Sequence, residues 1–384
     1  MFQALYNSLS GLFSFSKSLD TVSNNISNMN TPGFRGSDSF FSNINGGRGT
    51  QITGEGLRMQ AGDIRQTGNA TDLAIDGSGY FILRDDNGNF FYTRAGQFRF
   101  SEEGLLKDTV TGFQVMSIDA AGNLREIDFD IYRTLPPQAT TAIKIAGNIA
   151  PGSSSVSAGT INYFDTIGES HTLTVVLTDT STVTPNSYSV AITDETGAQV
   201  GTGEIRFGTD GTPLIGFTTL VINVVNKGVT QQLNLNFGSP GAFDGATLLA
   251  GTATNLGGRA TDGHALLGAT DVSFDNNGIM QITYSSSEKR QGPQIALANF
   301  QDESSLKLIG GRLIDGQSSQ SPELGRPGKG VFGRINGNSL ELANVDLTQE
   351  FADMIIIQRG YQASSRVMTV SNEMIEQLYN STRG

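Results

Sequence analysis

Cysteine and tryptophan are both absent from this chain, and histidine occurs only twice. Without cysteine, neither a disulfide bond nor a cysteine-ligated zinc site can form. No stretch approaches 18 consecutive apolar residues, so we expect no membrane-spanning helix. Basic residues are also scarce, because 25 Lys and Arg stand against 37 Asp and Glu, for a net charge of −12. No basic patch interrupts this negative field, which excludes nucleic-acid binding.

The residue types that enzymes use for nucleophilic or cofactor chemistry form no recognisable motif. His171 and His264 are far apart in the sequence, and we expect each to be a surface residue rather than a ligand or a base. There is no G-x-S-x-G nucleophile elbow. Gly328–Lys329 lacks the upstream glycine of a phosphate-binding loop, because Glu323 occupies that position. The sequence therefore predicts no catalytic residue and no cofactor.

Pairs of acidic residues are also candidate catalytic residues, because glycoside hydrolysis requires only two carboxylates. The candidates are Asp85–Asp86, Glu102–Glu103, and Asp128 with Asp130. The first two pairs lie in expected hairpin turns, where acidic residues serve turn geometry and solubility. Calcium binding at Asp85–Asn89 is a further alternative, but this run lacks the distal bidentate glutamate of an EF-hand loop. We expect neither catalysis nor metal binding at these positions.

Glycine is abundant, with 48 copies beside 37% apolar residues. This content indicates many turns between short strands. Several polar turns close on a glycine next to apolar strand residues, which predicts β-hairpins. These turns are Asp86–Asn89, Ser101–Gly104, Asp119–Gly122 and Asp275–Gly278.

The first thirty residues carry apolar side chains at steps of three and four, with serines and asparagines between them. A helix of this composition is marginal alone and needs a partner. The segment does not fit a cleavable signal peptide, because its first basic residue is Lys17 and serines interrupt the apolar run. The N-terminal seam residues, which we predict to mediate self-assembly, are Leu5, Leu9, Leu12, Leu19, Val22 and Ile26.

The last forty residues predict a second helix, with Asp346 as its N-cap. Apolar residues recur here at intervals of seven, which is typical of a coiled-coil-like seam. Gly360 costs about 1 kcal/mol relative to alanine in mid-helix, so it predicts a close helix contact. Helices that lie outside every strand favour packing between subunits over packing on their own sheet. The C-terminal seam residues, also predicted to mediate self-assembly, are Leu347, Phe351, Met354, Ile357, Tyr361, Met368, Ile375 and Leu378.

These patterns predict a multidomain protein in which N- and C-terminal coiled-coil-like α-helices bracket two nested all-β domains. Alternating apolar residues in the middle of the chain indicate antiparallel sheets with one solvated face, as in a sandwich or barrel. A self-assembling structural subunit of an extracellular filament fits this organisation better than an enzyme. We expect a helical domain at 1–30 with 345–384, an extended connector at 31–70, an inner β domain at 71–145 with 269–344, and an inserted outer β domain at 146–268.

Three parts of the chain carry distinctive local sequences: Asn24–Arg35, Leu73–Phe81 with Thr93–Phe98, and Asn344–Thr348 with Gln358–Arg366. They resemble the signatures of the bacterial flagellar rod, hook and hook-associated proteins, the axial family of the flagellum. The first resembles the N-terminal signature, the second resembles the segment that follows it in the rod and hook members, and the third resembles the C-terminal signature. The third departs slightly, because Ser364 stands where the family more often has asparagine.

The inserted outer block makes the chain resemble the hook members of this family more than the distal rod subunits, which lack such a block. The resemblance implies export through the flagellar type III apparatus and assembly into a curved tubular universal joint between rod and filament, with the terminal helices lining its channel. It also implies an extracellular location at the flagellum basal body and hook. The implied partners are other copies of the chain and the flagellar rod, hook cap and hook–filament junction proteins. A distal rod subunit and a secreted carbohydrate-binding β protein are the alternatives.

Overall fold

The computed structural model describes residues 2–44, 49–303, 306, 308–315 and 321–382. The chain packs into two units, because an inserted unit, Thr134–Ala269, interrupts a first unit made of the residues before and after it. The insertion begins at Thr134, whereas the sequence analysis placed its start at 146. Terminal helices around a large all-β body are confirmed. The finer division into four domains and the coiled-coil character of the helices stay predictions.

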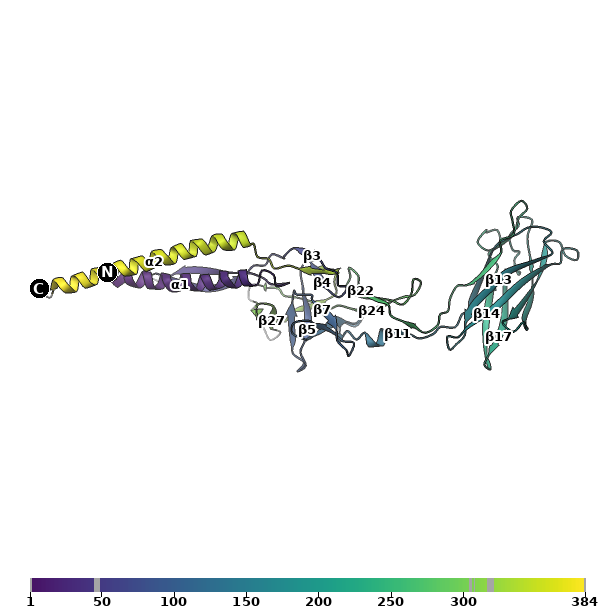
Figure 1. The fold of residues 1–384 in the computed structure, drawn as a ribbon, viewed down its shortest axis with the longest axis horizontal. Helices are drawn as coiled ribbons and strands as arrows, with labels where there is room; N and C mark the ends of the chain where they lie inside the picture. Colours follow the sequence, from purple (N-terminus) through teal and green to yellow (C-terminus); the bar gives the residue numbers. More distant parts are fainter. Residues whose placement is uncertain (1, 45–48, 304–305, 307, 316–320, 383–384) are drawn as a thin grey trace. The chain divides into compact units, whose positions relative to one another are not determined.

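Helices α1 (Phe2–Ser27) and α2 (Leu347–Thr382) belong to the first unit and run antiparallel beside each other (Figure 1). The predicted N-cap of α2 is confirmed, because Asp346 Oδ1 accepts hydrogen bonds from the backbone N–H groups of Thr348 (2.8 Å) and Gln349 (3.4 Å). These bonds satisfy donors that have no partner within the helix. The two predicted helices are therefore present, and within one chain they are partners.

A β-hairpin packs against α1 where the sequence predicted an extended connector with short strands. Strands β1 (Ser37–Asn43) and β2 (Thr50–Leu57) pair antiparallel, and both contact α1. Further along, β3 (Ile64–Gln66) pairs antiparallel with β30 (Ser339–Glu341). The segment after α1 therefore joins the N-terminal and C-terminal parts of the first unit.

The remaining strands of the first unit lie on either side of the insertion in the sequence. Those before it are β4 (Leu73–Asp76), β5 (Tyr80–Arg84), β6 (Phe90–Thr93), β7 (Phe98–Phe100), β8 (Leu106–Asp108), β9 (Gln114–Ile118) and β10 (Leu124–Glu126), followed by a 3₁₀ turn at Asp130–Tyr132. Those after it are β22 (Asp271–Phe274), β23 (Ile279–Thr283), β24 (Lys289–Gln294), β25 (Leu297–Asn299), β26 (Leu308–Ile309), β27 (Leu313–Asp315), β28 (Glu323–Gly325) and β29 (Arg334–Gly337).

A ten-stranded sheet holds this body together. Its strand β5 pairs with β6 and β9 from before the insertion and with β25 from after it. Phe81, Ile82 and Leu83 of β5 are fully buried. A continuous apolar run of this kind is what a strand buried on both faces requires. Strands from both sides of the insertion in the sequence are therefore needed to complete this sheet.

The inserted unit consists mainly of two sheets that share one apolar core. The first sheet, β13-β14-β15-β16, is antiparallel as predicted. The second sheet, β17-β18-β12-β19 with β20, is mixed, because β12 runs parallel to β18 and β19. The expectation of antiparallel sheets alone was therefore wrong at β12. The inward-facing residues of the alternating pattern are all buried: Leu173, Val175, Leu177, Tyr188, Val190, Ile192, Leu233, Leu235 and Phe237.

The inserted unit contains strands β11 to β21. Its first and last strands, β11 and β21, pair with each other. Their bounds are β11 (Thr134–Leu135), β12 (Ala142–Ile149), β13 (Ser155–Phe164), β14 (Ser170–Asp179), β15 (Ser187–Asp194), β16 (Gln199–Arg206), β17 (Thr219–Asn226), β18 (Val229–Asn236), β19 (Ala246–Leu248), β20 (Gly257–Ala260) and β21 (Leu267–Gly268).

The predicted glycine-closed turns are present, and their glycines adopt positive φ, as at Gly122 (92°). Asp119 shows what the acidic residue of such a turn does: its Oδ1 accepts hydrogen bonds from the backbone N–H groups of Ala121 and Asn123, both at 2.9 Å. The Arg125 side chain, with these N–H groups, lowers the pKa of Asp119 to about 2. The carboxylate therefore stabilises the turn by accepting hydrogen bonds from its backbone.

Candidate assembly surface

The face of α1 that becomes buried is lined mainly by small polar residues, and Val22 is the one residue of the predicted apolar seam among them. Its buried residues are Ser8, Gly11, Ser14, Ser18, Thr21, Val22 and Asn25. Both α2 and the β1–β2 hairpin contact α1. Small side chains let a helix approach its neighbours closely, and a hydroxyl group can find a backbone partner there. The serines that weaken α1 as an isolated helix are therefore the residues that fit it into place.

Two glycines lie where the two helices contact each other. A Cβ on Gly360 of α2 would lie 2.5 Å from the ring of Phe15 in α1, which confirms the predicted close contact at this position. A Cβ on Gly11 of α1 would lie 3.0 Å from the Ser364 hydroxyl of α2. A Cβ at Gly360 would force the Phe15 ring to move, and a Cβ at Gly11 would require a smaller shift of the Ser364 hydroxyl. The two glycines therefore leave room for side chains of the opposite helix.

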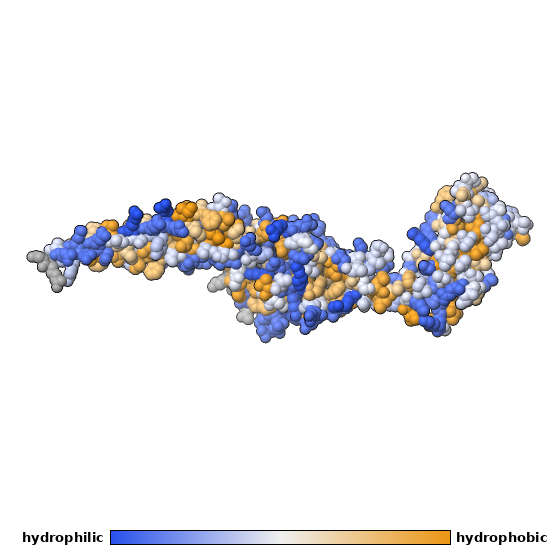
Figure 2. Space-filling model, viewed as in Figure 1, coloured by the Kyte–Doolittle hydropathy of each residue, from blue (hydrophilic) through white to orange (hydrophobic). Residues whose placement is uncertain are grey.

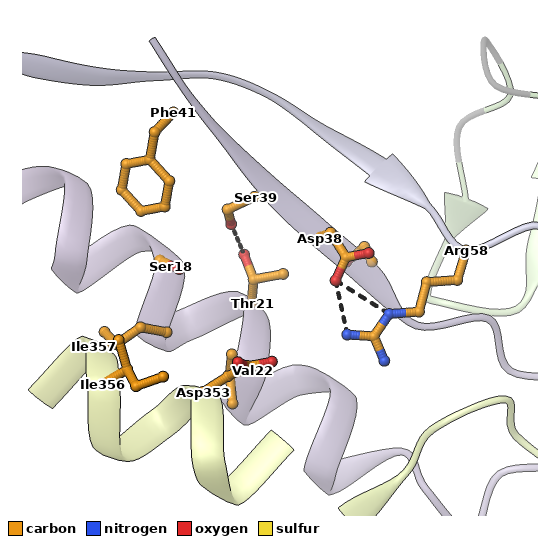
Figure 3. A pocket seen from close by; sticks show the side chains of 11 residues that line it. Ser18, Thr21, Val22, Asp38, Ser39, Phe41, Arg58, Asp353, Ile356 and Ile357 are labelled. Atoms are coloured by element: carbon orange, nitrogen blue, oxygen red, sulfur yellow. Dashed lines mark hydrogen bonds and ion pairs between the residues drawn. The ribbon is translucent and has the colours of Figure 1, made fainter. Parts of the chain in front are cut away.

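The hairpin supplies hydrogen-bond partners to three of the polar side chains on the buried face of α1, those of Ser14, Thr21 and Asn25. Ser14 donates to the carbonyl oxygen of Thr50 (3.0 Å), and the Thr21 and Ser39 hydroxyls share a hydrogen bond of 2.8 Å (Figure 3). Asn25 closes the end of this face, because its Nδ2 donates to the Ser37 carbonyl (2.9 Å) and its Oδ1 accepts from the Ser37 N–H (3.0 Å). Burial of these polar groups therefore costs little.

The predicted seam residues occupy several environments in the structure. Val22 and Ile357 are buried, while Leu5, Leu12, Leu19, Ile26, Leu347, Met354, Met368 and Ile375 are half-buried. Leu9, Phe351, Tyr361 and Leu378 are exposed. On α2 the buried positions are Glu350, Ile357 and Ser371, and of these Ile357 belongs to the predicted seam. The structure brings part of the seam to the contact between the helices and leaves the rest on the surface, and its role in self-assembly stays a prediction.

Further apolar side chains on the helix pair are exposed, and the seam pattern missed them. Phe2 and Phe13 of α1 expose 79% and 70% of their surface, and Ile355 and Ile356 of α2 expose 59% and 66%. Figure 2 shows apolar colour over much of this region. Large exposed apolar patches mark interaction sites in proteins that do not aggregate. The other exposed apolar residues of the pair are Tyr6, Val367, Val370, Met374 and Tyr379.

A buried ion pair fastens the start of α2 to the hairpin. The Glu350 carboxylate, fully buried, accepts from Arg58 Nη1 (2.6 Å) and from Asn25 Nδ2 (3.2 Å). Arg58 also contacts Asp38 at 2.7 Å, and the hydrogen bond to Asp38 is the largest cause that raises the pKa of this guanidinium. Hydrogen bonds between charged groups of this kind are short and strongly directional. The end of α1, the hairpin and the start of α2 are thereby linked at one point.

A second buried cluster lies where the helices join the inner body. Glu341 of β30 accepts from Arg94 Nε (2.8 Å) and from the Gly62 N–H (3.1 Å), and Arg35 Nη2 lies 3.6 Å away. Arg94 also donates to the carbonyl oxygens of Gly77 (2.9 Å), Gly79 and Ile75. An arginine can satisfy several acceptors at once because its donors have a fixed fork geometry. This cluster therefore positions the helix pair on the inner body.

A cavity lies between α1, α2 and the hairpin (Figure 3). Among the residues that line it, Asp38 and Arg58 pair with each other, and Asp353 is the remaining charged group. The other lining residues are hydroxyl-bearing or apolar. The side chains around this cavity serve packing and pairing, and they do not converge on a reacting group.

The two histidines differ from their predicted surface positions. His264 is 7% exposed, and its Nδ1 lies 2.7 Å from the carbonyl oxygen of Ala265. The His171 side chain is 12% exposed and lies between two carboxylates, those of Asp165 and Glu195. The expectation of surface histidines was therefore wrong, because both side chains are largely covered within the inserted unit.

The helices of the described residues lack the length and hydrophobicity that a membrane-spanning helix needs.

Family models match three parts of the chain, and together these contain the segments that carried the resemblance except for Leu73. They are described as "Flagella basal body rod protein" over residues 5–35, "Flagellar hook protein FlgE/F/G D1 domain" over 74–156, and "Flagellar basal body rod FlgEFG protein C-terminal" over 337–381.

Relatives match over nearly the whole chain. The flagellar hook protein FlgE of Rhizobium meliloti is 30% identical over 100% of both chains. FlgE of Escherichia coli is 28% identical over 98% of this chain and 99% of the relative. Among solved structures, Helicobacter pylori flagellar hook protein FlgE2 matches with a TM-score of 0.50 and 14% identity, over 72% of this chain and 100% of that one. The last match supports the fold alone.

Proposed function

This chain belongs to the flagellar hook protein family, and from that premise we propose that its helix pair, α1 with α2, joins the copies of the polymer. The chain is a structural subunit of the flagellar hook, an extracellular part of the flagellum. The family has a structural role and is not a family of enzymes. The observation that carries the proposal is the apolar surface left exposed on both helices.

The exposed and half-buried seam residues and the other exposed apolar side chains of the pair contact neighbouring subunits. Each buried apolar side chain contributes about 1.5–3 kcal/mol, so a few of them suffice for stable association. The exposed faces of α1 and α2 are not equivalent, since one helix is rich in serine and the other is not. Non-equivalent surfaces that meet head to tail build an open helical assembly. This supports a tubular polymer held together by the helices.

We further propose the finer features that the resemblance to the hook members of the family implies. The polymer is a curved tube that acts as a universal joint between rod and filament, with its helices lining the central channel. Its bending requires contacts between β units that slide, while the helices supply the lasting cohesion. The chain reaches this place by export, unfolded, through the flagellar type III apparatus. The flagellar rod, hook cap and hook–filament junction proteins are its further partners.

A pair of isoleucine substitutions tests the role of the helix pair. Ile355→Asp places a charge at a position of α2 that is 59% exposed, so the monomer should keep its circular dichroism spectrum. Loss of the apolar contact raises the critical concentration for polymerisation at least about tenfold, as measured by sedimentation. Ile131→Asp, at a 72% exposed position outside the helices, is the matched control and should polymerise normally. Normal polymerisation of Ile355→Asp would contradict the proposal.

Electron microscopy of the assembled protein tests the form of the polymer. Curved tubes of limited length are the expected result. Straight and rigid tubes would instead indicate a rod-like subunit of the same family.

A further inference from the structure

One end of the inserted unit gathers three potential metal ligands. Asp165 and Glu169 flank the turn between β13 and β14, and His171 lies two residues further, on β14. One ligand atom of each residue lies within 4.8 Å of the others. The assembly proposed above does not use this site, and the sequence alone predicted no metal site here.

The buried carboxylate of Asp165 is already oriented toward the histidine. Its side chain is 6% exposed, and its Oδ1 accepts hydrogen bonds from the backbone N–H groups of Ile167 (3.0 Å) and Glu169 (2.8 Å). Its Oδ2 lies 3.4 Å from His171 Nε2, which is long for a hydrogen bond to a charged group. Two ligands of a tetrahedral ion with bonds of 2.0–2.2 Å lie about 3.4 Å apart. The spacing therefore fits a shared metal ion.

The histidine ring has a carboxylate at each nitrogen. Nδ1 lies 3.4 Å from Glu195 Oε1, while Nε2 faces Asp165. Neutral imidazole carries a single N–H, so if Nδ1–H points to Glu195, the lone pair of Nε2 faces an anionic oxygen. A metal ion between Nε2 and Asp165 Oδ2 removes this repulsion. A carboxylate on the second nitrogen is the arrangement that orients metal-binding histidines.

The ring is also held sterically. His171 is the cross-strand partner of Tyr163, and their ring centroids are 5.5 Å apart. The Tyr163 hydroxyl in turn shares a hydrogen bond with the Asn226 side chain at the end of β17. The histidine therefore cannot turn away from the cluster without breaking packing contacts.

The charges around the ring are not balanced. Among the residues that the structure describes, the three carboxylates of Asp165, Glu169 and Glu195 have one lysine or arginine partner, the Lys227 ammonium, which pairs with Glu169. Lys227 is 65% exposed at its side chain, so it can leave at little cost. The lysine thus already places a positive charge where a dication would bind.

We propose that Asp165, Glu169 and His171 bind a first-row divalent transition metal, such as Zn²⁺ or Co²⁺, with Glu195 orienting the histidine. One imidazole with two carboxylates suits such ions. Bound metal ties the β13–β14 turn to strand β14 and stiffens this end of the inserted unit.

Titration of the full-length protein with Co²⁺, followed by the visible absorption of the ion, tests the site. Saturable binding of one ion that Zn²⁺ displaces is expected, together with a rise in the thermal midpoint of the protein. His171→Gln and Glu169→Gln should each abolish the saturable absorption. Glu195→Gln should weaken binding about tenfold. Lys227→Gln should strengthen binding, because it removes the competing cation.

His264→Gln, at the other histidine, is the control and should bind Co²⁺ like the unmodified protein. Circular dichroism establishes that each variant is folded. The proposal is overturned if the unmodified protein shows no saturable Co²⁺ absorption. It is also overturned if the folded Glu169→Gln and His171→Gln variants bind Co²⁺ unchanged.

Discussion

Single residues decide how closely the parts of the first unit approach one another. Gly360 allows the Phe15 ring to lie against α2, and Glu341 collects two arginines that start from distant points of the chain. Both residues lie in or beside segments that resembled a family signature. Gly360 leaves room for a neighbouring ring because it has no side chain, and Glu341 provides a buried carboxylate that pairs with arginines.

Removing the charge of Glu341 should destabilise the first unit strongly. Glu341→Ala leaves Arg94, 3% exposed, without its carboxylate partner. Loss of one member of a buried ion pair costs about 3–5 kcal/mol. Hydrogen exchange of strands β4 and β29 measures this as lowered protection.

The control for this prediction is Glu323→Ala, at an exposed position of β28, which should change stability by no more than about 0.5 kcal/mol. Equal protection in Glu341→Ala and the unmodified protein would show that the cluster adds nothing to stability.

At the scale of elements, α1 and α2 are unequal partners. α1 has seven buried residues, most of them small and polar, while α2 buries three over a greater length. A helix with so many serines pays a propensity cost that tertiary contacts must offset. The hairpin β1–β2 supplies part of this support through backbone carbonyls. The stability of α1 therefore depends on its neighbours.

Truncation of the chain after Asn344 should unfold α1 as well as remove α2. The truncated chain loses the contacts of Ser364 with Gly11 and of Glu350 with Asn25. Hydrogen exchange should show loss of protection in Phe2–Ser27, while the inserted unit keeps its protection as the internal control. Unchanged protection of α1 would mean that the hairpin alone is a sufficient partner.

At the scale of the whole molecule, one unit with its own core is inserted into the chain of another. Thr134–Ala269 has its own apolar core, in which Tyr163, Tyr188 and Phe237 are nearly or fully buried. The first unit closes its ten-stranded sheet with strands from both sides of the insertion. Each unit therefore has the internal contacts that a folded domain needs.

The segment 134–269, expressed alone, should fold and unfold in a single cooperative transition. Its core needs no residue of the first unit, and its termini are paired through β11 and β21. Thermal unfolding followed by circular dichroism, with agreement between calorimetric and van't Hoff enthalpies, measures this. A chain with exposed apolar surface and no cooperative transition would contradict independent folding.

The sequence by itself determined the local features of this protein: two terminal helices, the cap at Asp346, the glycine-closed turns and the alternating core strands. These depend on neighbouring residues, since helix caps, turn φ angles and strand periodicity are short-range properties. The resemblance of both ends and the first β block also placed the chain in its family. Gly360 predicted the helix contact because glycine is costly in mid-helix and needs a reason.

Only the tertiary structure decided which helix face is buried, how β12 pairs and which charges meet. An apolar period cannot identify the serine face of α1, because close packing there depends on small size and on carbonyls supplied by the hairpin. Parallel pairing of β12 joins strands far apart in the chain. The partners Asn25 and Glu350 are separated by 325 positions, as His171 and Glu195 are by 24. Such pairs form because the fold brings together residues that are distant in the chain, and no local pattern contains that information.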